Sequence, residues 1–570
     1  MNSALLALLA LVGYLVAYYT YGKFIGSRIL RISDRNPMPA HELRDDVDFV
    51  PTRRSIVFGH HFTTIAGLGP IVGPAIGIIW GWLPAFLWVF LGSIFMGAVH
   101  DFATLVVSAR NKGMTMGELT GKIISPSTRY ALQFIMQLLL FIVLAVFALI
   151  VGTLFYMYPQ SVIPVWLQIP IALWLGNALR QGRNEILFSA IALLLMYGAI
   201  ILGVYVPVNL PGNPQTVIST WCVILFIYVF FASTTPVQVL LQPRDYINAQ
   251  QLLVAMLLIV AGIAVAHPQI TAPAVNKVAF EPGSDIPSMA PVMFIIIACG
   301  AISGFHSLAS SGTTVKQVDR EGDTRIIGYG GMITESFFAV LVLMAVGGGL
   351  GMGLVVDGEL LTGAAAYHHH YSSWSAANGL GAKLGAFISG GANLLHSIGI
   401  PTKFGAAMIS VFIVSFANTT LDSAARIQRL SLQEIFRNRE GDVKSPINNR
   451  YFSTFLIVTI AALMTFLKPG GQGAMMLWPL FGSLNQLMAA LALGVVTVYL
   501  HSKNKPIYYT MLPMIFVLVV TLWAMVENLF MFVADGDLLL TILSVIVLIL
   551  TLVLTANSMR ALIRKREVST

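Results

Sequence analysis

Charged residues are scarce in this chain of 570 residues. Asp, Glu, Lys and Arg make up 10% of it, against about 25% in a typical soluble domain, whereas apolar residues make up 57%. This imbalance excludes an ordinary soluble globular protein and predicts a membrane protein. No separate soluble domain is expected.

Cysteine is almost absent as well. Cys222 and Cys299 are the only two, and both fall inside long apolar stretches. Two such residues exclude a disulfide framework and a cysteine-type zinc site. The first apolar stretch also lacks a preceding basic segment and a small-residue cleavage motif, so we expect a retained helix and not a signal peptide.

Long apolar stretches fill most of the chain. Most are near the roughly 20 residues that a helix needs to cross the hydrocarbon core of a membrane. Fifteen stretches are expected to span the membrane: 4–24, 58–80, 82–109, 130–156, 160–178, 184–206, 215–238, 247–267, 289–309, 326–355, 402–421, 451–467, 474–500, 507–531 and 536–559. The connection 356–401 is expected to contain a helix near 379–397.

Lys and Arg fall almost entirely on alternate connections. If the N-terminus lies outside, 29 of the 33 lie on inner connections, and the outer ones are Lys277, Lys383, Lys403 and Lys468. The positive-inside rule therefore predicts a multi-pass protein of the cell (inner) membrane, with its N-terminus outside and its C-terminus cytoplasmic. Because these residues are spread over loops, they indicate contact with membrane lipid and no nucleic acid partner.

The stretch 58–80 does not have the composition of a straight apolar helix. Its segment FGHHFTTIAGLGPIVGPAIG is rich in Gly and Pro, which free backbone groups and are tolerated in a membrane only beside protein or a wet cavity. Such breaks form binding sites in secondary transporters, and a kinked packing helix is the alternative. The candidate substrate-binding residues here are His60, His61, Thr63, Thr64, Gly67 and Gly69.

Three further polar segments interrupt apolar stretches. They are FASTTPVQVLLQPRDY at 231–246, ACGAISGFHSLASSGTTVKQ from 298 and FANTTLDSAARIQR at 416–429. The substrate-binding candidates that they add are Thr234, Thr235, Gly304, His306 and Ser307. The candidates for ion coupling are Ser310, Ser311, Asn418, Thr419 and Thr420. Hard cations prefer such oxygen ligands, although Ser and Thr also serve in ordinary helix packing.

The directions of these stretches indicate an inverted repeat of two five-helix units. The stretch 58–80 runs from inside to outside, whereas the other three run from outside to inside. One register makes 215–238 the second broken helix, and another starts the second unit at 289–309. We prefer the first register. The chain then divides into an N-terminal helix with its connection (1–57), a transport core (58–421) and a cytoplasmic helix with the C-terminal spans (422–570).

Ionisable side chains inside the spans are few, and each costs at least ~2.5 kcal/mol to insert. His60, His61 and His306 fit proton coupling or anion binding, and a structural histidine is the alternative. Asp101 and Glu335 are candidate ion-coupling residues that carry a proton, with a salt bridge to a loop arginine as the competing account. We expect H⁺ in preference to Na⁺ as the coupling ion.

Several of these segments resemble the carbon starvation (CstA) family of transporters. The motifs are GHHFTTIAGLGPIVGP, GAVHDFATLVVSARNKGMTMGEL, LLQPRDYIN, ACGAISGFHSLASSGTT, GYGGMITESF and LWPLFGSLNQ. The resemblance implies a secondary active carrier of the amino acid, polyamine and organocation superfamily. It also implies a LeuT-like 5+5 inverted-repeat core. Together with the fifteen apolar stretches, this predicts an all-α polytopic membrane protein of about 15 transmembrane helices, with extra peripheral helices around that core. The family includes pyruvate and peptide carriers, and its resemblance places the histidines and neighbouring hydroxyls along the substrate path.

Two other classes of function compete with this interpretation. An intramembrane metalloenzyme is suggested by His60, His61, His100 and Asp101, but no zinc-type spacing such as HExxH is present. A channel would not require several broken helices. We therefore expect no enzyme, no cofactor and no bound metal. The expected function is cation-coupled symport of a small carboxylate such as pyruvate, with a short peptide as the alternative substrate.

Overall fold

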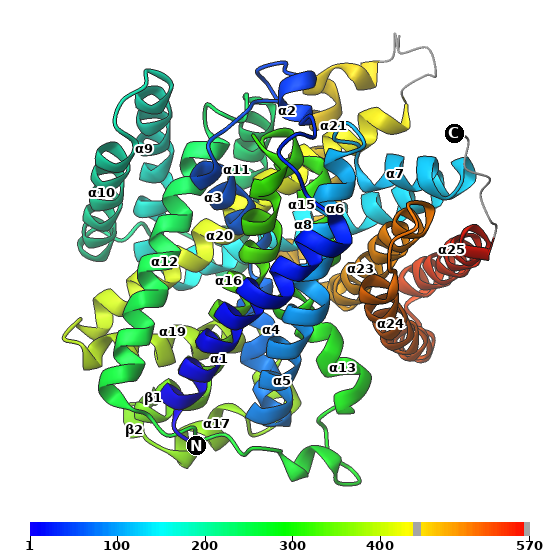
Figure 1. Ribbon diagram of the computed structural model, residues 1–570. Coiled ribbons are helices and arrows are strands. Elements are labelled where there is room, and N and C mark those ends of the chain that lie inside the picture. Colours follow the sequence, from blue (N-terminus) through cyan, green and yellow to red (C-terminus); the bar gives the residue numbers. More distant parts are fainter. Residues whose placement is uncertain (437–445, 564–570) are drawn as a thin grey trace.

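A computed structural model describes residues 1–436 and 446–563 of the chain, and helices dominate it (Figure 1). Nine long or central helices form the bulk of the bundle: α5 (Trp82–Gly92), α6 (Ala98–Ala109), α8 (Pro126–Met157), α11 (Pro214–Thr234), α12 (Leu241–Ala266), α16 (Gly331–Met344), α20 (Thr402–Ile435), α21 (Arg450–Thr465) and α23 (Trp478–Ser502). Helices α8 and α20 pack along each other in its centre. Most of their residues are buried, as expected of helices that neighbouring helices surround.

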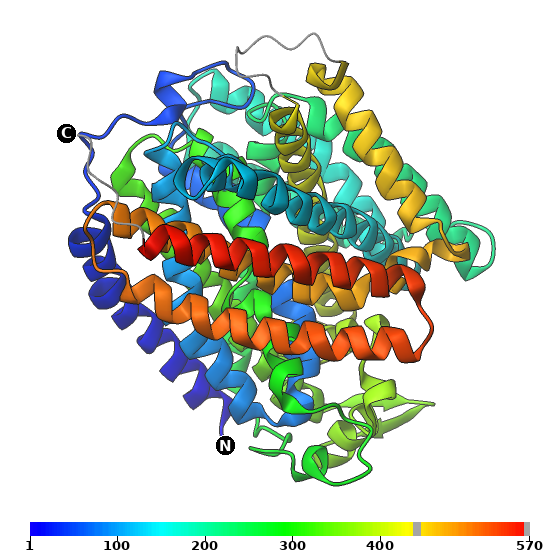
Figure 2. The ribbon, with the colours of Figure 1, turned by 90° about the vertical axis from the view of Figure 1, so that its right-hand side faces the viewer.

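Five more helices lie around this bundle. Helix α1 runs diagonally across its front, α9 and α10 form a hairpin at one side, and α24 and α25 lie side by side on another flank (Figures 1 and 2). Their bounds are α1 (Ser3–Ala17), α9 (Val162–Arg180), α10 (Glu185–Tyr205), α24 (Tyr508–Ala534) and α25 (Leu538–Ile563). Their exposed faces carry leucine, isoleucine and phenylalanine, which suits contact with lipid.

Within the described ranges, twelve helices are long and apolar enough to cross a membrane. The bent pair of α3 (Arg54–Ile65) and α4 (Gly69–Gly77) forms a thirteenth candidate span, and its two segments are bent by 45° relative to each other. The other two expected spans form shorter helices. One is α21, with 16 residues, and the other is divided into α13 (Met289–Ile296), α14 (Ala298–Ala301) and α15 (Gly304–Gly312).

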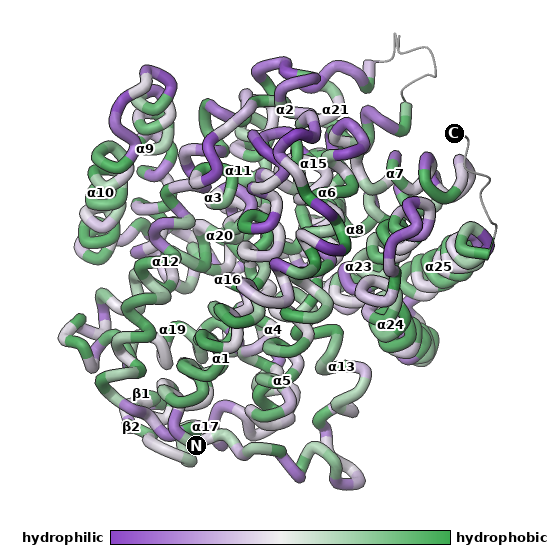
Figure 3. Tube along the Cα trace, viewed as in Figure 1, coloured by the Kyte–Doolittle hydropathy of each residue, from purple (hydrophilic) through white to green (hydrophobic). Residues whose placement is uncertain are grey.

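The two ends of the bundle differ in polarity (Figure 3). Hydrophilic segments gather at the end with the short helices α2 (Pro39–Glu42) and α7 (Met116–Ile123), which we call the α2 face. The opposite end, the β1–β2 face, carries the N-terminus and an antiparallel hairpin of β1 (Leu354–Val356) and β2 (Glu359–Leu361). It also carries α17 (Ala364–His370), α18 (Trp374–Ala377) and α19 (Leu380–Ser397), the last of which confirms the helix expected near 379–397.

The two broken helices pack so closely that little more than backbone atoms fits between α4 and the α13–α14 segment. A Cβ added at Gly69 would overlap Cys299, and one added at Gly73 would overlap the carbonyl oxygen of Ile296. Only glycine allows α4 to approach α13 and α14 this closely. The glycines that interrupt the apolar pattern therefore serve the contact between the two breaks.

The second break lies in a different stretch from the one that the preferred register uses. Helix α11 continues without interruption to Thr234, and Thr235 and Pro236 follow its end. The break instead lies at Ile302 and Ser303, which are extended between α14 and α15. This agrees with the register that starts the second unit at 289–309. Helix α20 runs through residues 421 and 422, between which the predicted boundary of the transport core lies.

Candidate functional site

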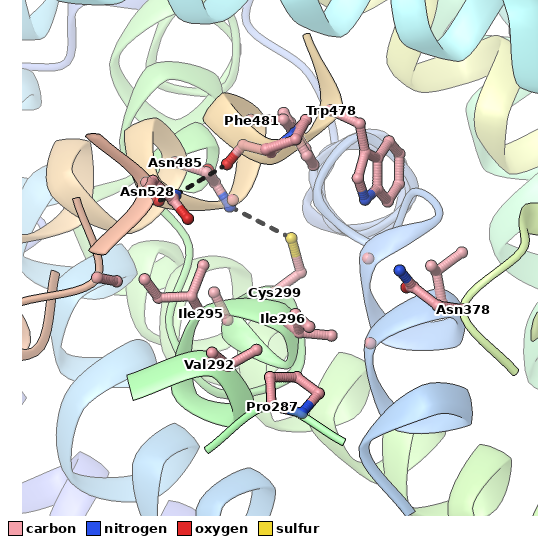
Figure 4. A pocket seen from close by; sticks show the side chains of 18 of the residues that line it. Pro287, Val292, Ile295, Ile296, Cys299, Asn378, Trp478, Phe481, Asn485 and Asn528 are labelled. Carbon is pink, nitrogen blue, oxygen red and sulfur yellow. Dashed lines mark hydrogen bonds between the residues drawn. The ribbon is translucent and has the colours of Figure 1, made fainter. Parts of the chain in front are cut away.

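A cavity of about 330 Å³ lies where the two broken helices meet (Figure 4). We call it the central cavity. Gly69 and Gly73 line it from α4, and Ile295 and Cys299 line it from α13 and α14. Further walls come from α8, the start of α23, α24 and the connections of the β1–β2 face. Most of the lining is apolar with a few polar groups, as is usual for small-molecule sites.

The side chain of Asn485 holds the second break open beside this cavity. Its Oδ1 accepts hydrogen bonds from the Phe305 backbone N–H at 2.8 Å and from the Ser303 hydroxyl at 3.1 Å. Its Nδ2 donates to the Cys299 sulfur at 3.3 Å, as Figure 4 shows. Asn485 therefore satisfies a backbone amide that the break exposes at the start of α15.

Lys383 of α19 also lines the central cavity. Its side chain is nearly buried, and its ammonium lies 5.7 Å from the centre of the Trp478 ring. Among the described residues, Lys383 has no ion-pair partner. Burial lowers the pKa of its ammonium to about 8. The other ionisable residue in the lining is Glu527, whose carboxylate accepts a hydrogen bond from the Trp523 indole at 2.6 Å.

A second group of ionisable side chains is fully buried outside the cavity lining. Asp101 of α6 accepts from His306 of α15 at 2.8 Å and contacts the neighbouring His100 at 2.7 Å. His306 Nε2 lies 3.4 Å from Glu335 of α16, and Glu335 makes no other polar contact within the described residues. We call these four residues the His306 cluster. Within the described residues, Asp101 pairs with no loop arginine, contrary to the competing account.

A third group ties four helices together on the α2 side of the breaks. Arg244 of α12 pairs with Asp422 of α20 and donates to Tyr228 of α11 at 2.5 Å. Asp245, beside Arg244, bonds His60 of α3 at 2.6 Å. All five side chains are buried. We call this group the Arg244 network.

Asp48 holds the connection before α3 against α20. Its carboxylate pairs with Arg426 at 2.7 Å and with Arg429 at 3.1 Å. Burial alone would raise the pKa of Asp48, but Arg429 and Arg426 hold it below its ordinary value. The two arginines near Asp422 in sequence therefore pair with Asp48 and not with Asp422.

The remaining predicted side chains mostly bond to protein. His61 Nδ1 lies 2.9 Å from the Thr314 hydroxyl. Thr64 contacts Ser423 at 3.1 Å, and Thr420 donates to the Thr64 carbonyl at 3.3 Å, which joins α3 to α20. The hydroxyls that bond back to their own helices are those of Thr63, Thr234, Thr235 and Ser307. Gly67 and Gly304 pack against Thr420 and Asn485, respectively.

The ion-coupling candidates are also divided between several places. Ser311 accepts from the Met116 backbone N–H at 3.2 Å, and Thr419 accepts from Asn248 at 2.8 Å. Ser310 Oγ and Asn418 Oδ1 are buried and lack a hydrogen-bond partner among the described residues. Together with Thr420, these residues lie on α15 and α20 and do not form one cluster with Asp101 and Glu335.

Of the predicted substrate-binding residues, Gly69 alone lines the central cavity in the described part of the chain. Nδ1 of each histidine and most of the hydroxyls near the breaks bond within the protein, and Nε2 of His60, His61 and His306 has no hydrogen-bond partner among the described residues. The sequence reasoning missed Lys383, Trp478 and Asn485. Two signals were present: Lys383 is one of four basic residues assigned to the outer side, and the other two lie in the motif LWPLFGSLNQ.

Comparison with known proteins places this arrangement among transporters. The profile of the family described as carbon starvation protein CstA matches residues 2–524. The peptide transporter CstA of Mycobacterium tuberculosis is 34% identical, over 91% of this chain and 74% of that relative. The pyruvate/proton symporter BtsT of Escherichia coli is 31% identical, over 91% of this chain and 80% of that relative.

A solved structure supports the fold. The manganese transporter of Eremococcus coleocola, solved with an aromatic bis-isothiourea compound, superposes with a TM-score of 0.50 at 13% identity. The match covers 91% of this chain and 99% of that one. At this identity the likeness concerns the fold alone, which is LeuT-like as the sequence resemblance implied.

Proposed function

The chain belongs to the carbon starvation protein CstA family, and we propose that it is a secondary active symporter that couples the uptake of a small carboxylate to a proton. Pyruvate is the first candidate substrate, and a short peptide is the alternative. Relatives with each of these substrates in their names are similar to this chain over most of its length.

The observation that supports this proposal most is the central cavity at the meeting point of two broken helices. In transporters of inverted-repeat construction, half-helix ends at the midplane offer partial charges to a substrate. Helix α4 begins at Gly69, which lines the cavity, so the positive end of its dipole faces the bound molecule. A volume of about 330 Å³ accepts pyruvate and also a larger carboxylate.

The His306 cluster is the proposed site of proton coupling. Glu335 is a buried carboxyl group with few partners, so its neutral form costs less than its charged form until a cation approaches. His306 lies between Glu335 and Asp101 and joins α15 to α6 and α16. A proton that moves among these groups changes the attraction between three helices. The proton can thereby bias the position of the second broken helix.

The Arg244 network supports a state closed toward the α2 face. It joins α3, α11, α12 and α20 through buried ion pairs, whereas the central cavity is lined by connections of the β1–β2 face. We assign the β1–β2 face to the outside and the α2 face to the cytoplasm, from the distribution of basic residues. On this assignment, the N-terminus of the chain is proposed to lie outside the cell membrane. Alternating access then requires the Arg244 network to open.

A sodium ion is the alternative coupling ion. The Thr64 carbonyl and the hydroxyls of Thr420 and Ser423 gather oxygen atoms between α3 and α20. Hard cations prefer oxygen ligands, but this group contains no carboxylate, and Thr64, Thr420 and Ser423 already bond to one another. The proton is favoured because the His306 cluster holds titratable groups.

Uptake into proteoliposomes tests the proposal. Labelled pyruvate is offered under a proton gradient or a sodium gradient, each imposed alone, with unlabelled dialanine as a competitor. We expect accumulation under the proton gradient. Accumulation of dialanine without that of pyruvate would select the peptide alternative, and accumulation of neither under any gradient would contradict the proposal.

A further inference from the structure

Lys383 occupies an unusual position for a lysine. Its side chain is 4% exposed, and α19 carries it into the wall of the central cavity beside Trp478. Buried cations in proteins are normally paired with a carboxylate, because removing a charge from water is costly. No acidic group among the described residues forms an ion pair with Lys383, and Glu527 on the cavity wall is bonded to Trp523.

Packing alone does not account for this charge. A methionine or leucine would fill the same space against the Trp478 ring without the cost of burying an ammonium. The cation–π contact at 5.7 Å offsets only part of the free-energy cost of burying the ammonium. The protein therefore keeps a buried cation that is incompletely compensated and that faces a cavity of ligand size.

We infer that Lys383 is the residue that binds the substrate carboxylate, with Trp478 holding its ammonium in place. This inference rests on the proposed function and adds a residue that determines substrate specificity. The N-terminal end of α4 at Gly69 lies on the same cavity and favours an anion there. A carboxylate between these two groups supplies the missing counter-charge of Lys383.

The inference also specifies what the site rejects. An analogue of the same shape without the carboxylate leaves the buried ammonium unpaired and desolvated, whereas a carboxylate pairs with it. Pyruvate and dialanine satisfy the site. Pyruvamide and the amide of dialanine do not. The selectivity for a carboxylate is thus independent of which acid is the natural substrate.

Thermal stabilisation of the purified full-length protein by ligands is the direct test. Pyruvate and dialanine are each compared with their amides on the wild type, Lys383→Met, Lys383→Arg and Lys403→Met. Lys403 is the matched control, because it lies on the same side of the molecule, is exposed and is outside the cavity lining. Loss of a hydrogen bond to a charged group predicts carboxylate affinity about tenfold to a hundredfold weaker in Lys383→Met.

A second readout distinguishes binding from folding. Without ligand, Lys383→Met should melt at the same temperature as the wild type or higher, since it removes an unpaired buried charge. Lys383→Arg should retain selectivity for carboxylates over amides, and Lys403→Met should behave as the wild type. Equal carboxylate affinity in Lys383→Met and the wild type, or equal stabilisation of the wild type by acids and amides, would overturn the inference.

The uptake assay, run on the wild type and on Lys383→Met beside the melting experiment, separates this inference from the proposed function. If the wild type binds carboxylates through Lys383 but accumulates none under an ion gradient, the role of Lys383 in binding is supported and transport is contradicted. If Lys383→Met leaves gradient-driven uptake unchanged, transport is supported and the role of Lys383 in binding is contradicted.

Discussion

The central cavity and the region on its α2 side both contain buried charged side chains, but they differ in whether those charges have partners within the protein. In the cavity, Lys383 faces open volume and has no ion-pair partner among the described residues. On the α2 side, Arg244 contacts Asp422 and Asp245, and Asp101 contacts two histidines. Charges that are paired within the protein hold helices together. An unpaired charge is available to a ligand.

Breaking the Arg244 network should have the largest effect. Arg244→Met leaves Asp422 and Asp245 buried beside each other without their shared cation. Loss of one partner from a buried pair lowers the free energy of unfolding by about 3–5 kcal/mol. Thermal melting in detergent measures the loss, with the exposed residue Arg180 replaced by methionine as the control. An Arg244→Met protein that melts like the wild type would show that the network does not stabilise this state.

Replacing the central histidines should abolish transport while the protein still inserts. His306→Ala removes the link between Asp101 and Glu335, and His61→Ala removes the contact of α3 with Thr314. We expect uptake of labelled pyruvate to fall at least tenfold in both, at unchanged membrane abundance. His396→Ala, on α19 and outside the cavity lining, is the control. Normal uptake by both variants would remove the histidines from the mechanism.

Asp101→Asn tests whether the His306 cluster carries the proton or only supports the fold. The amide keeps the shape of the carboxyl group but accepts no proton in the working range. Uptake driven by a proton gradient should decrease more than exchange of labelled for unlabelled substrate, because exchange needs no net proton movement. An equal loss in both assays would assign Asp101 to structure or binding.

The smallest expected effect is the pH dependence of pyruvate binding. Burial lowers the pKa of Lys383 to about 8, so the cation is present below that pH and is lost as the pH rises through it. Equilibrium binding of pyruvate at equal pH on both sides should therefore weaken several-fold between pH 7 and pH 9, where the fraction of charged lysine falls.

One nearby group does not interfere with that measurement. Burial lowers the pKa of His370 on the adjacent α17, which keeps it neutral. Lys383→Arg should remove the alkaline decline, since guanidinium stays charged. A decline that persists in Lys383→Arg would assign it to another group.

The sequence predicted the spans and the first break well, because both depend on local composition. Gly67, Gly69 and Pro70 interrupt an apolar stretch, and the structure bends there. The Thr-Thr-Pro segment after α11 has similar composition, yet it lies at the end of a helix. Composition alone does not tell at what depth in the membrane a polar segment will fall, so the second break was assigned to the wrong stretch in the preferred register.

The cavity wall was harder to predict for a different reason. Lys383, Trp478 and Asn485 come from a connection and from a helix far along the chain, and they converge only after the bundle packs. The sequence instead drew attention to His60 and His61, which lie outside the cavity lining and whose Nδ1 atoms bond within the protein. In a membrane span, residues that contact a ligand and residues that join helices are both polar residues within an apolar stretch, so the sequence does not distinguish them.

Movement of protons with substrate tests the central claim most directly. Proteoliposomes with a trapped pH-sensitive dye are given an inward gradient of pyruvate, with no initial gradient of protons or sodium and with the membrane voltage clamped by potassium and valinomycin. Proton symport predicts acidification of the interior that requires pyruvate and is absent in His306→Ala. Pyruvate uptake without acidification, or acidification that is the same in His306→Ala, would contradict the account.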